Sequence, residues 1–216
     1  MIHADKYRTI LDIERMQGKV MNKFAKILSY IFDGTLISIP MLIIICLAIV
    51  SNTAKALGWA FLCLTFAMII PYLYIHILFR KKVINDLHIS NKGDRIKPLI
   101  ITIISNTVGF SILYILKAPL FLEAMFLIVI ISTGILGAIT YFWKVSMHTA
   151  WITFMVITFN ILFGKWMLLL LPLIPMVGWA RVKIKRHTVK QVISGSIISS
   201  ITTFFVFFRY GFVNFL

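Results

Sequence analysis

The sequence predicts an all-α, polytopic transmembrane helical bundle with six to seven spans. Hydrophobic residues make up 60% of the chain, charged residues make up 13%, and the mean hydropathy is +0.96. These values are typical of integral membrane proteins, since about a quarter of the residues of a soluble domain are charged. Apolar stretches of about 20 residues, the length that crosses a bilayer as a helix, recur along the chain.

Four apolar stretches predict spans directly. They cover residues 28–50, 57–79, 98–116 and 120–143. Cys46 lies in the first of these spans and Cys63 in the second. Because neither cysteine belongs to a metal-binding spacing, we expect both to pack as small buried hydrophobic residues.

The apolar stretch 149–180 is too long for one span. A straight helix of this length would measure about 48 Å, whereas the hydrocarbon core is about 30 Å thick. Gly164-Lys165 is the natural break, which predicts two short spans at 149–163 and 166–180. A last span is predicted at 189–208, which gives seven spans, or six if the short pair packs irregularly.

The first 27 residues predict an amphipathic helix on the membrane surface. Apolar residues from Ile10 to Ile27 fall near one helical face, and Lys and Arg residues lie elsewhere. Such a helix binds the anionic headgroups of lipids through its basic side chains. With no internal repeat or linker, residues 28–216 are expected to form one transmembrane bundle.

Positive charge is unevenly distributed between the two predicted sides. With seven spans, 18 of the 22 Lys and Arg residues fall on one side, in the N-terminal segment and around residues 80–97, 144–148 and 181–190. The remaining four fall on the other side, at Lys55, Lys117, Lys165 and Arg209. The positive-inside rule therefore predicts a multi-pass protein of the cell membrane whose basic side faces the cytoplasm.

Two histidines lie on this basic side, because two predicted spans separate His148 from His187. Arg181 precedes His187 by six residues, and Gln191 follows it by four, which is one helical turn. A guanidinium binds phosphate oxygens bidentately, and a neutral imidazole can attack phosphorus. The alternative interpretation is a juxtamembrane basic cluster that contacts lipid headgroups.

Two further polar segments lie on the same side. Lys144, Ser146 and His148 place a cation, a hydroxyl and an imidazole within five residues, and Arg95 and Lys97 end the loop before the third span. Taken alone, the first segment is also typical of an interfacial helix start, and the second of an ordinary basic loop.

Together the three segments resemble the motifs of the type 2 phosphatidic acid phosphatase superfamily. Its motifs are a basic loop ending in Arg-Pro, a Pro-Ser-Gly-His turn, and Ser-Arg followed after five residues by His and four later by Asp. Here the order and spacing recur as Asp94-Arg95-Ile96-Lys97-Pro98, Val145-Ser146-Met147-His148, and Ala180-Arg181 with His187 and Gln191. The resemblance covers about half of the chain, and Gln191 stands where the family has Asp.

The resemblance implies a membrane lipid phosphatase that needs no cofactor or metal and binds no nucleic acid. His187 would be the nucleophile, His148 the general acid, and Gln191 the residue that orients His187. The expected phosphate-binding residues are Arg181, Arg95, Lys97, Ser146 and Lys144. The implied substrate is a membrane phospholipid or an isoprenoid phosphate or diphosphate.

Two other functions remain open. A bundle with these altered motifs could bind lipid phosphates without turnover, since Gln191 carries no charge and Val145-Ser146-Met147 replaces Pro-Ser-Gly. Alternatively, Asn85-Asp86 is similar to the Asp-rich loop of intramembrane prenyltransferases, which bind diphosphate through magnesium. Magnesium needs several carboxylates or bridging phosphates, and this loop contains only Asp86 and Asp94.

Two acidic residues, Asp33 and Glu123, lie inside predicted spans, and we expect Glu123 to pair with Lys117. Asp33 is an intramembrane carboxylate, which is costly unless it is paired or near an interface. Because Asp33 lies close to the start of the first span, we expect it to reach the lipid headgroups.

Overall fold

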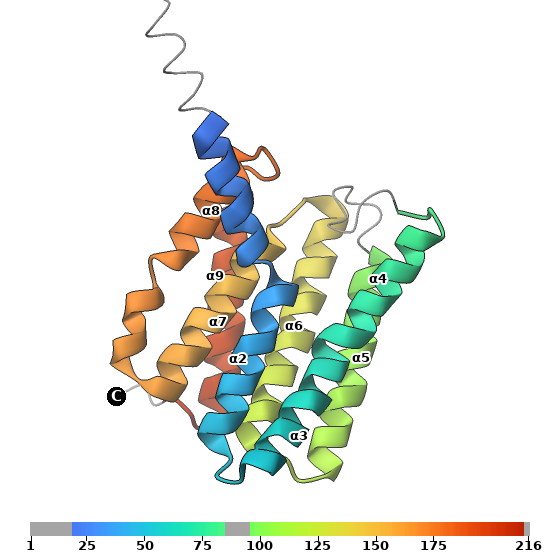
Figure 1. Ribbon diagram of the computed structural model, residues 1–216, viewed down its shortest axis with the longest axis vertical. Coiled ribbons are helices and arrows are strands. Elements are labelled where there is room, and N and C mark those ends of the chain that lie inside the picture. Colours follow the sequence, from blue (N-terminus) through green and yellow to red (C-terminus); the bar gives the residue numbers. More distant parts are fainter. Residues whose placement is uncertain (1–18, 85–95, 214–216) are drawn as a thin grey trace, which may run out of the picture.

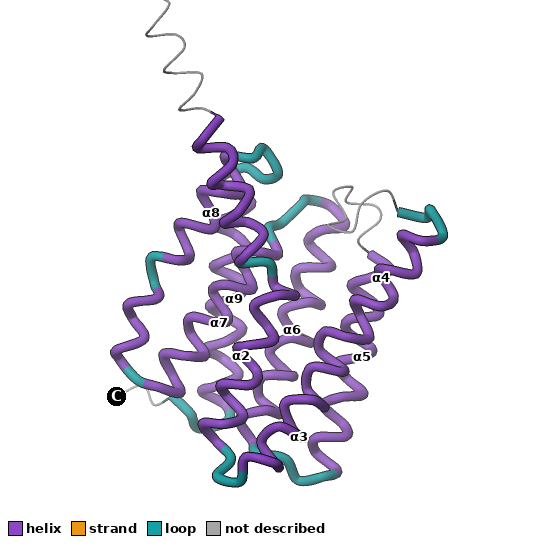
Figure 2. The backbone as a smooth tube through the Cα atoms, in the orientation of Figure 1, coloured by secondary structure: helices purple, strands orange, loops and turns teal. Residues whose placement is uncertain are grey.

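A computed structural model describes residues 19–84 and 96–213 of the chain. Within these two ranges the chain forms helices joined by turns and contains no strand, as the tube in Figure 2 shows. The long helices run side by side as a bundle (Figure 1). The predicted all-α helical bundle is therefore confirmed.

The helices follow the predicted spans closely. In chain order the elements are α2 (Gly34–Ile49), α3 (Thr53–Leu64), η1 (Thr65–Ile69), α4 (Ile70–Arg80), α5 (Ile96–Ile115), α6 (Leu120–Phe142), α7 (Met147–Phe163), η3 (Lys165–Leu170), α8 (Leu173–Lys183) and α9 (Val189–Arg209). Among the described residues, five helices are long and apolar enough to cross a membrane, counting Thr53–Arg80 as one. The bent pair Lys19–Ile31 and Leu36–Ile49 adds a sixth, and α7 is a shorter apolar helix.

The chain folds back at Gly164, as expected. Gly164 has a φ of +82°, in the region that glycine adopts without a steric penalty, and its N–H donates to the carbonyl of Asn160. The short segment η3 then leads through Pro172 into α8, and the proline φ of −59° suits a helix start. This fold-back lets α8 return along α7, which it contacts.

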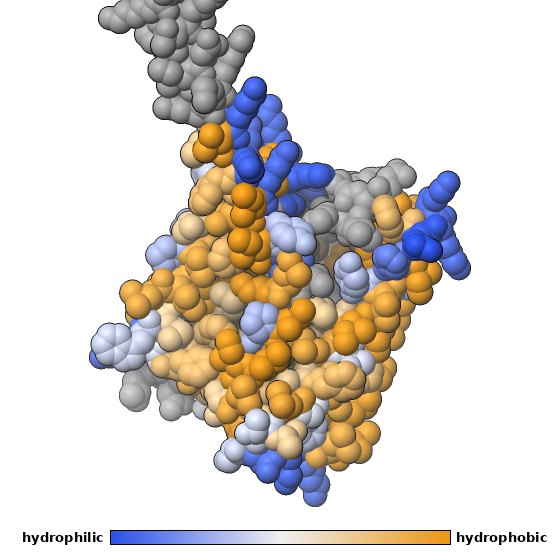
Figure 3. Space-filling view, viewed as in Figure 1, coloured by the Kyte–Doolittle hydropathy of each residue, from blue (hydrophilic) through white to orange (hydrophobic). Residues whose placement is uncertain are grey.

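Helix α7 begins at the end of the bundle where the helix Lys19–Ile31 meets α2, which is called the polar end below. It packs against α9, α8 and α2, while α6 packs against both α5 and α9 (Figure 1). Leu122, Ile128 and Ile152 belong to the central hydrophobic cluster, and Cys46 and Cys63 are fully buried there, as predicted. Hydrophobic side chains cover the middle of the face seen in Figure 3, and hydrophilic ones gather at its two ends.

The helix Lys19–Ile31 precedes α2 and is bent by 44° from Leu36–Ile49. Its buried residues Ala25 and Leu28 pack against Ala180 of α8, and its lysines are exposed. The helix thus continues past the predicted boundary at residues 27 and 28 and is attached to the bundle. Residues 1–18 of the predicted amphipathic segment lie outside the described residues.

Candidate active site at the polar end of the bundle

His148 lies in the first turn of α7, and the cap of that helix sets its position. Ser146 is the N-cap residue, and its Oγ accepts from the N–H of Thr149 at 3.5 Å. The preceding loop is tied to the turn between α8 and α9, because Lys144 Nζ donates to the carbonyl of Arg186 at 3.0 Å. His148 is therefore presented beside that turn.

Arg181 lies in the last turn of α8, and His187 lies in the turn between α8 and α9. The N–H groups of Arg186 and His187 both donate to the carbonyl of Arg181, at 3.1 and 3.3 Å. Lys185 adopts a φ of +56°, the left-handed conformation that commonly ends a helix. This compact turn holds the backbone of His187 directly against that of Arg181.

A capping box at the start of α9 determines the tautomer of His187. Thr188 is the N-cap residue, and its backbone N–H donates to Gln191 Oε1 at 3.1 Å. The same oxygen lies 3.2 Å from Nδ1 of His187. Because a backbone N–H only donates and an amide oxygen only accepts, Nδ1 carries a proton, so that in the neutral imidazole the lone pair is on Nε2.

Close packing of α7 against α9 holds the two histidine-bearing segments together. The N–H of Ser146 donates to the carbonyl of Gln191 at 3.2 Å, and Thr149 Oγ1 donates to the carbonyl of Val192 at 3.0 Å. Gly195 allows this approach, since a Cβ at this position would clash with the carbonyl of Ser146 and lie 2.8 Å from Thr149 Oγ1. The close contact between α7 and α9 therefore depends on the absence of a side chain at Gly195.

Arg181 is the common neighbour of the polar side chains at this site. Arg181 is 6% exposed, and its Nη1 donates to Ser29 Oγ at 2.6 Å and lies 3.5 Å from Nε2 of His148. The same Nε2 lies 3.1 Å from Oδ2 of Asp33, with the two side chains 13% and 20% exposed. A guanidinium, an imidazole and a carboxylate therefore converge where the helix Lys19–Ile31 meets α2.

No match to this chain was found among protein-family models, curated proteins or solved structures. The chemistry of the site is therefore inferred from its own residues and their contacts.

The structure gathers six of the predicted site residues at one end of the bundle. They are Lys144, Ser146, His148, Arg181, His187 and Gln191. Lys97 is exposed in the first turn of α5. Arg95 lies outside the described residues, as do Asn85 and Asp86 of the prenyltransferase alternative.

Two predicted phosphate-binding side chains have local structural contacts. The Ser146 hydroxyl is fully buried at the cap of α7, and the Lys144 ammonium contacts a backbone carbonyl. Both help to position His148. Among the described residues, no group of three or more His, Cys, Asp or Glu side chains is arranged to hold a metal ion.

Sequence reasoning missed three residues of this site. Asp33 was interpreted as reaching lipid headgroups, but it contacts His148. Ser29 was not singled out, and it accepts from Arg181 across 152 positions of the chain. Thr188 was also missed, although Thr188 and Gln191 carry the Thr-x-x-Gln spacing of a capping box, a signal readable from the sequence.

Proposed function

We propose that this protein is an integral membrane phosphatase that hydrolyses a lipid phosphate or diphosphate through a phosphohistidine on His187. The observation that carries the proposal is the unequal surroundings of the two histidines. A neutral amide holds His187 with its lone pair on Nε2, which suits a nucleophile. A carboxylate lies against His148 and stabilises the protonated imidazolium, which suits an acid.

Arg181 supports the proposal because it contacts one histidine through its side chain and the other through its backbone. The residue is nearly buried, so its charge is only weakly screened by water. During phosphoryl transfer, negative charge spreads over the equatorial phosphate oxygens, and a fixed cation stabilises that charge.

The proposed reaction has two steps. In the first, the lone pair on Nε2 of His187 forms a bond to phosphorus while the bond from phosphorus to the lipid oxygen breaks, and His148 gives its proton to that oxygen. In the second, water attacks phosphorus, the phosphorus–nitrogen bond breaks with its electrons returning to His187, and His148 takes a proton from the water. Inorganic phosphate leaves, and both histidines regain their starting protonation states.

The surroundings of the site suit a lipid substrate. Exposed Lys19, Lys23 and Lys26 lie on the helix that contributes Ser29, at a level where anionic headgroups bind basic side chains. The phosphate of a lipid can then reach Arg181 while its chains stay in the bilayer. We place this end of the bundle at the cytoplasmic face of the cell membrane, since most of the Lys and Arg residues belong to it.

The test is phosphate release by the purified protein from phosphatidic acid and polyprenyl phosphate, with EDTA present. We expect His187→Ala and His148→Ala to abolish release, and His76→Ala, a change at an exposed histidine of α4, to preserve it. Full activity of the His187→Ala protein would contradict the proposal.

The second candidate function is binding of lipid phosphates without turnover. It is favoured by Gln191, which provides no negative charge to stabilise a phosphorylated, cationic His187. Acid-labile 32P on His187 after rapid mixing with labelled phosphatidic acid would exclude this candidate. Saturable binding without such labelling would support it.

A further inference from the structure

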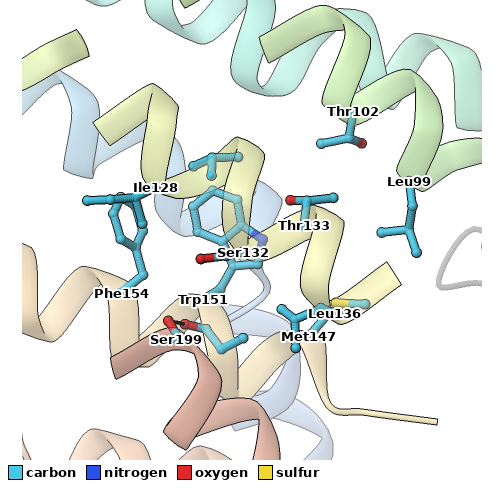
Figure 4. Close-up of a pocket in the computed structure, with 12 residues that line it drawn as sticks. Leu99, Thr102, Ile128, Ser132, Thr133, Leu136, Met147, Trp151, Phe154 and Ser199 are labelled. Atoms are coloured by element: carbon cyan, nitrogen blue, oxygen red, sulfur yellow. Dashed lines mark hydrogen bonds between the residues drawn. The ribbon is translucent and has the colours of Figure 1, made fainter. Parts of the chain in front are cut away.

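An apolar cavity lies next to the candidate active site, between α5, α6, α7 and α9. It has a volume of about 130 Å³, and its wall includes Leu99, Leu136, Met147, Trp151 and Phe154 (Figure 4). From Met147 to Phe154 it follows α7 for seven residues, which corresponds to a depth of about 10 Å at 1.5 Å per residue. The cavity thus extends from the polar end into the bundle.

Two residues connect the cavity to the site. Met147 lines the cavity and directly precedes His148 in the chain. Trp151 also lines it, and its ring packs so closely on Gly34 that a Cβ there would lie 2.7 Å from Trp151 Cδ1. Gly34 follows Asp33, the partner of His148. The cavity wall therefore begins one residue from the proposed acid along α7.

The wall contains four hydroxyl groups, one of them that of Thr133, and the other three make hydrogen bonds within the protein. Thr102 Oγ1 donates to the carbonyl of Pro98 at 2.9 Å, and Ser199 Oγ donates to the carbonyl of Ala150 at 2.7 Å. Ser132 Oγ lies 2.6 Å from the Thr202 hydroxyl. These groups have protein partners, so the wall offers mainly carbon atoms to an occupant, and a cavity of this kind suits hydrocarbon better than water.

A groove on the outer surface of the bundle shares one wall residue with the cavity. The groove lies between α5 and α6 and is lined by Leu99, Gly134, Gly137 and Tyr141 among others, and Leu99 also lines the cavity. The groove exists because Gly134 and Gly137 have no side chains. A Cβ at Gly134 would meet no atom within 4 Å.

We propose that the cavity binds one hydrocarbon chain of the lipid whose phosphate is bound at Arg181, with the chain leaving past Leu99 through the groove. A dry cavity of about 150 Å³ holds a benzene molecule, so this one has room for about six carbons. Those carbons are the ones nearest the headgroup, because the cavity wall begins one residue from His148. This assignment rests on the proposed function and adds a chain-binding site to it.

The first test is photo-crosslinking in the intact protein. The probe is a phosphonate analogue of phosphatidic acid, which cannot be hydrolysed, with a diazirine on the fourth to sixth carbon of one chain. We expect it to label peptides containing Met147 or Leu136, and unlabelled phosphatidic acid to compete. Labelling spread evenly over the outer surface, or equal labelling by a diacylglycerol probe without phosphate, would overturn the proposal.

The second test fills the groove between α5 and α6 with a large side chain. Gly134→Phe places a ring in the groove, and its matched control is Gly58→Phe in α3, where a Cβ also meets no atom within 4 Å and the groove is not involved. We expect Gly134→Phe to raise the KM for long-chain phosphatidic acid about tenfold and to leave hydrolysis of water-soluble p-nitrophenyl phosphate unchanged. Equal KM values for the two variants would overturn the proposal.

The two tests separate this inference from the proposed function. Site-specific crosslinking by the phosphonate without any phosphate release would retain the chain-binding site and contradict the phosphatase. Phosphate release that depends on His187, combined with crosslinking outside the cavity, would retain the phosphatase and contradict the chain-binding site.

Discussion

Replacement of Asp33 by Asn tests the acid role of His148 most directly. The amide keeps the shape of the side chain and removes the charge that lies 3.1 Å from Nε2 of His148. A hydrogen bond to a charged group contributes about 1.5–3 kcal/mol in proteins. Since 1.36 kcal/mol corresponds to a factor of ten in rate, we expect kcat/KM for phosphatidic acid to fall about 10- to 150-fold. The partial exposure of both side chains favours the lower half of that range.

The choice of substrate separates acid catalysis from general damage to the site. The alkoxide released from phosphatidic acid needs a proton, whereas p-nitrophenolate leaves without one. We therefore expect Asp33→Asn to slow the hydrolysis of phosphatidic acid strongly and that of p-nitrophenyl phosphate only slightly. The matched control is Glu123→Gln, which converts another carboxyl group of the bundle, near the start of α6, into an amide.

Two results would refute this reasoning. An equal loss on both substrates would mean that Asp33 only maintains the structure. A lower KM with unchanged or higher kcat would mean that the Asp33 carboxylate competes with phosphate for Arg181 and His148. Thermal unfolding of the variant in detergent shows whether the fold itself is retained.

Three further changes address the packing and charge around the two histidines. Gln191→Glu keeps the capping box and adds a charge beside His187, so we expect about tenfold faster phosphohistidine formation in rapid-quench experiments. Gly195→Ala creates a clash with the carbonyl of Ser146, so both the melting temperature and the activity should fall, while Gly58→Ala, where a Cβ meets no atom within 4 Å, should lower neither. Thr188→Val removes the cap of α9 and should lower the free energy of unfolding by about 1 kcal/mol, measured by denaturation in detergent.

The spans were predictable because hydropathy is a local property of the chain. Six of the seven predicted spans begin and end within four residues of a helix or helix pair, while the first begins inside the helix Lys19–Ile31, and the predicted break at Gly164 coincides with a backbone φ of +82°. The pairing of His187 with Gln191 was predictable for the same reason, since four residues make one helical turn.

The remaining contacts of the site depend on how distant helices pack. Asp33 and Ser29 precede the first predicted motif by more than 60 residues, and no local pattern indicates that they meet His148 and Arg181. Burial also changes what a polar side chain does. Ser146, a predicted phosphate-binding residue, also caps α7, because the backbone N–H groups at the start of a helix need an acceptor and its hydroxyl provides one.

The bend between the helix Lys19–Ile31 and α2 gives the N-terminal segment a role beyond membrane attachment. A straight continuation would keep the buried face of the first helix in line with that of α2, whereas the 44° bend directs this helix over the end of α8. Ser29 and Asp33 lie on either side of the bend and contact Arg181 and His148. Lysines of the same helix are exposed, and under the proposed function they bind headgroups, which would link the position of the headgroup layer to that of Asp33. Under the proposed function, a lipid phosphate that reaches Arg181 would meet an acid, His148, whose partner Asp33 is positioned by this bend.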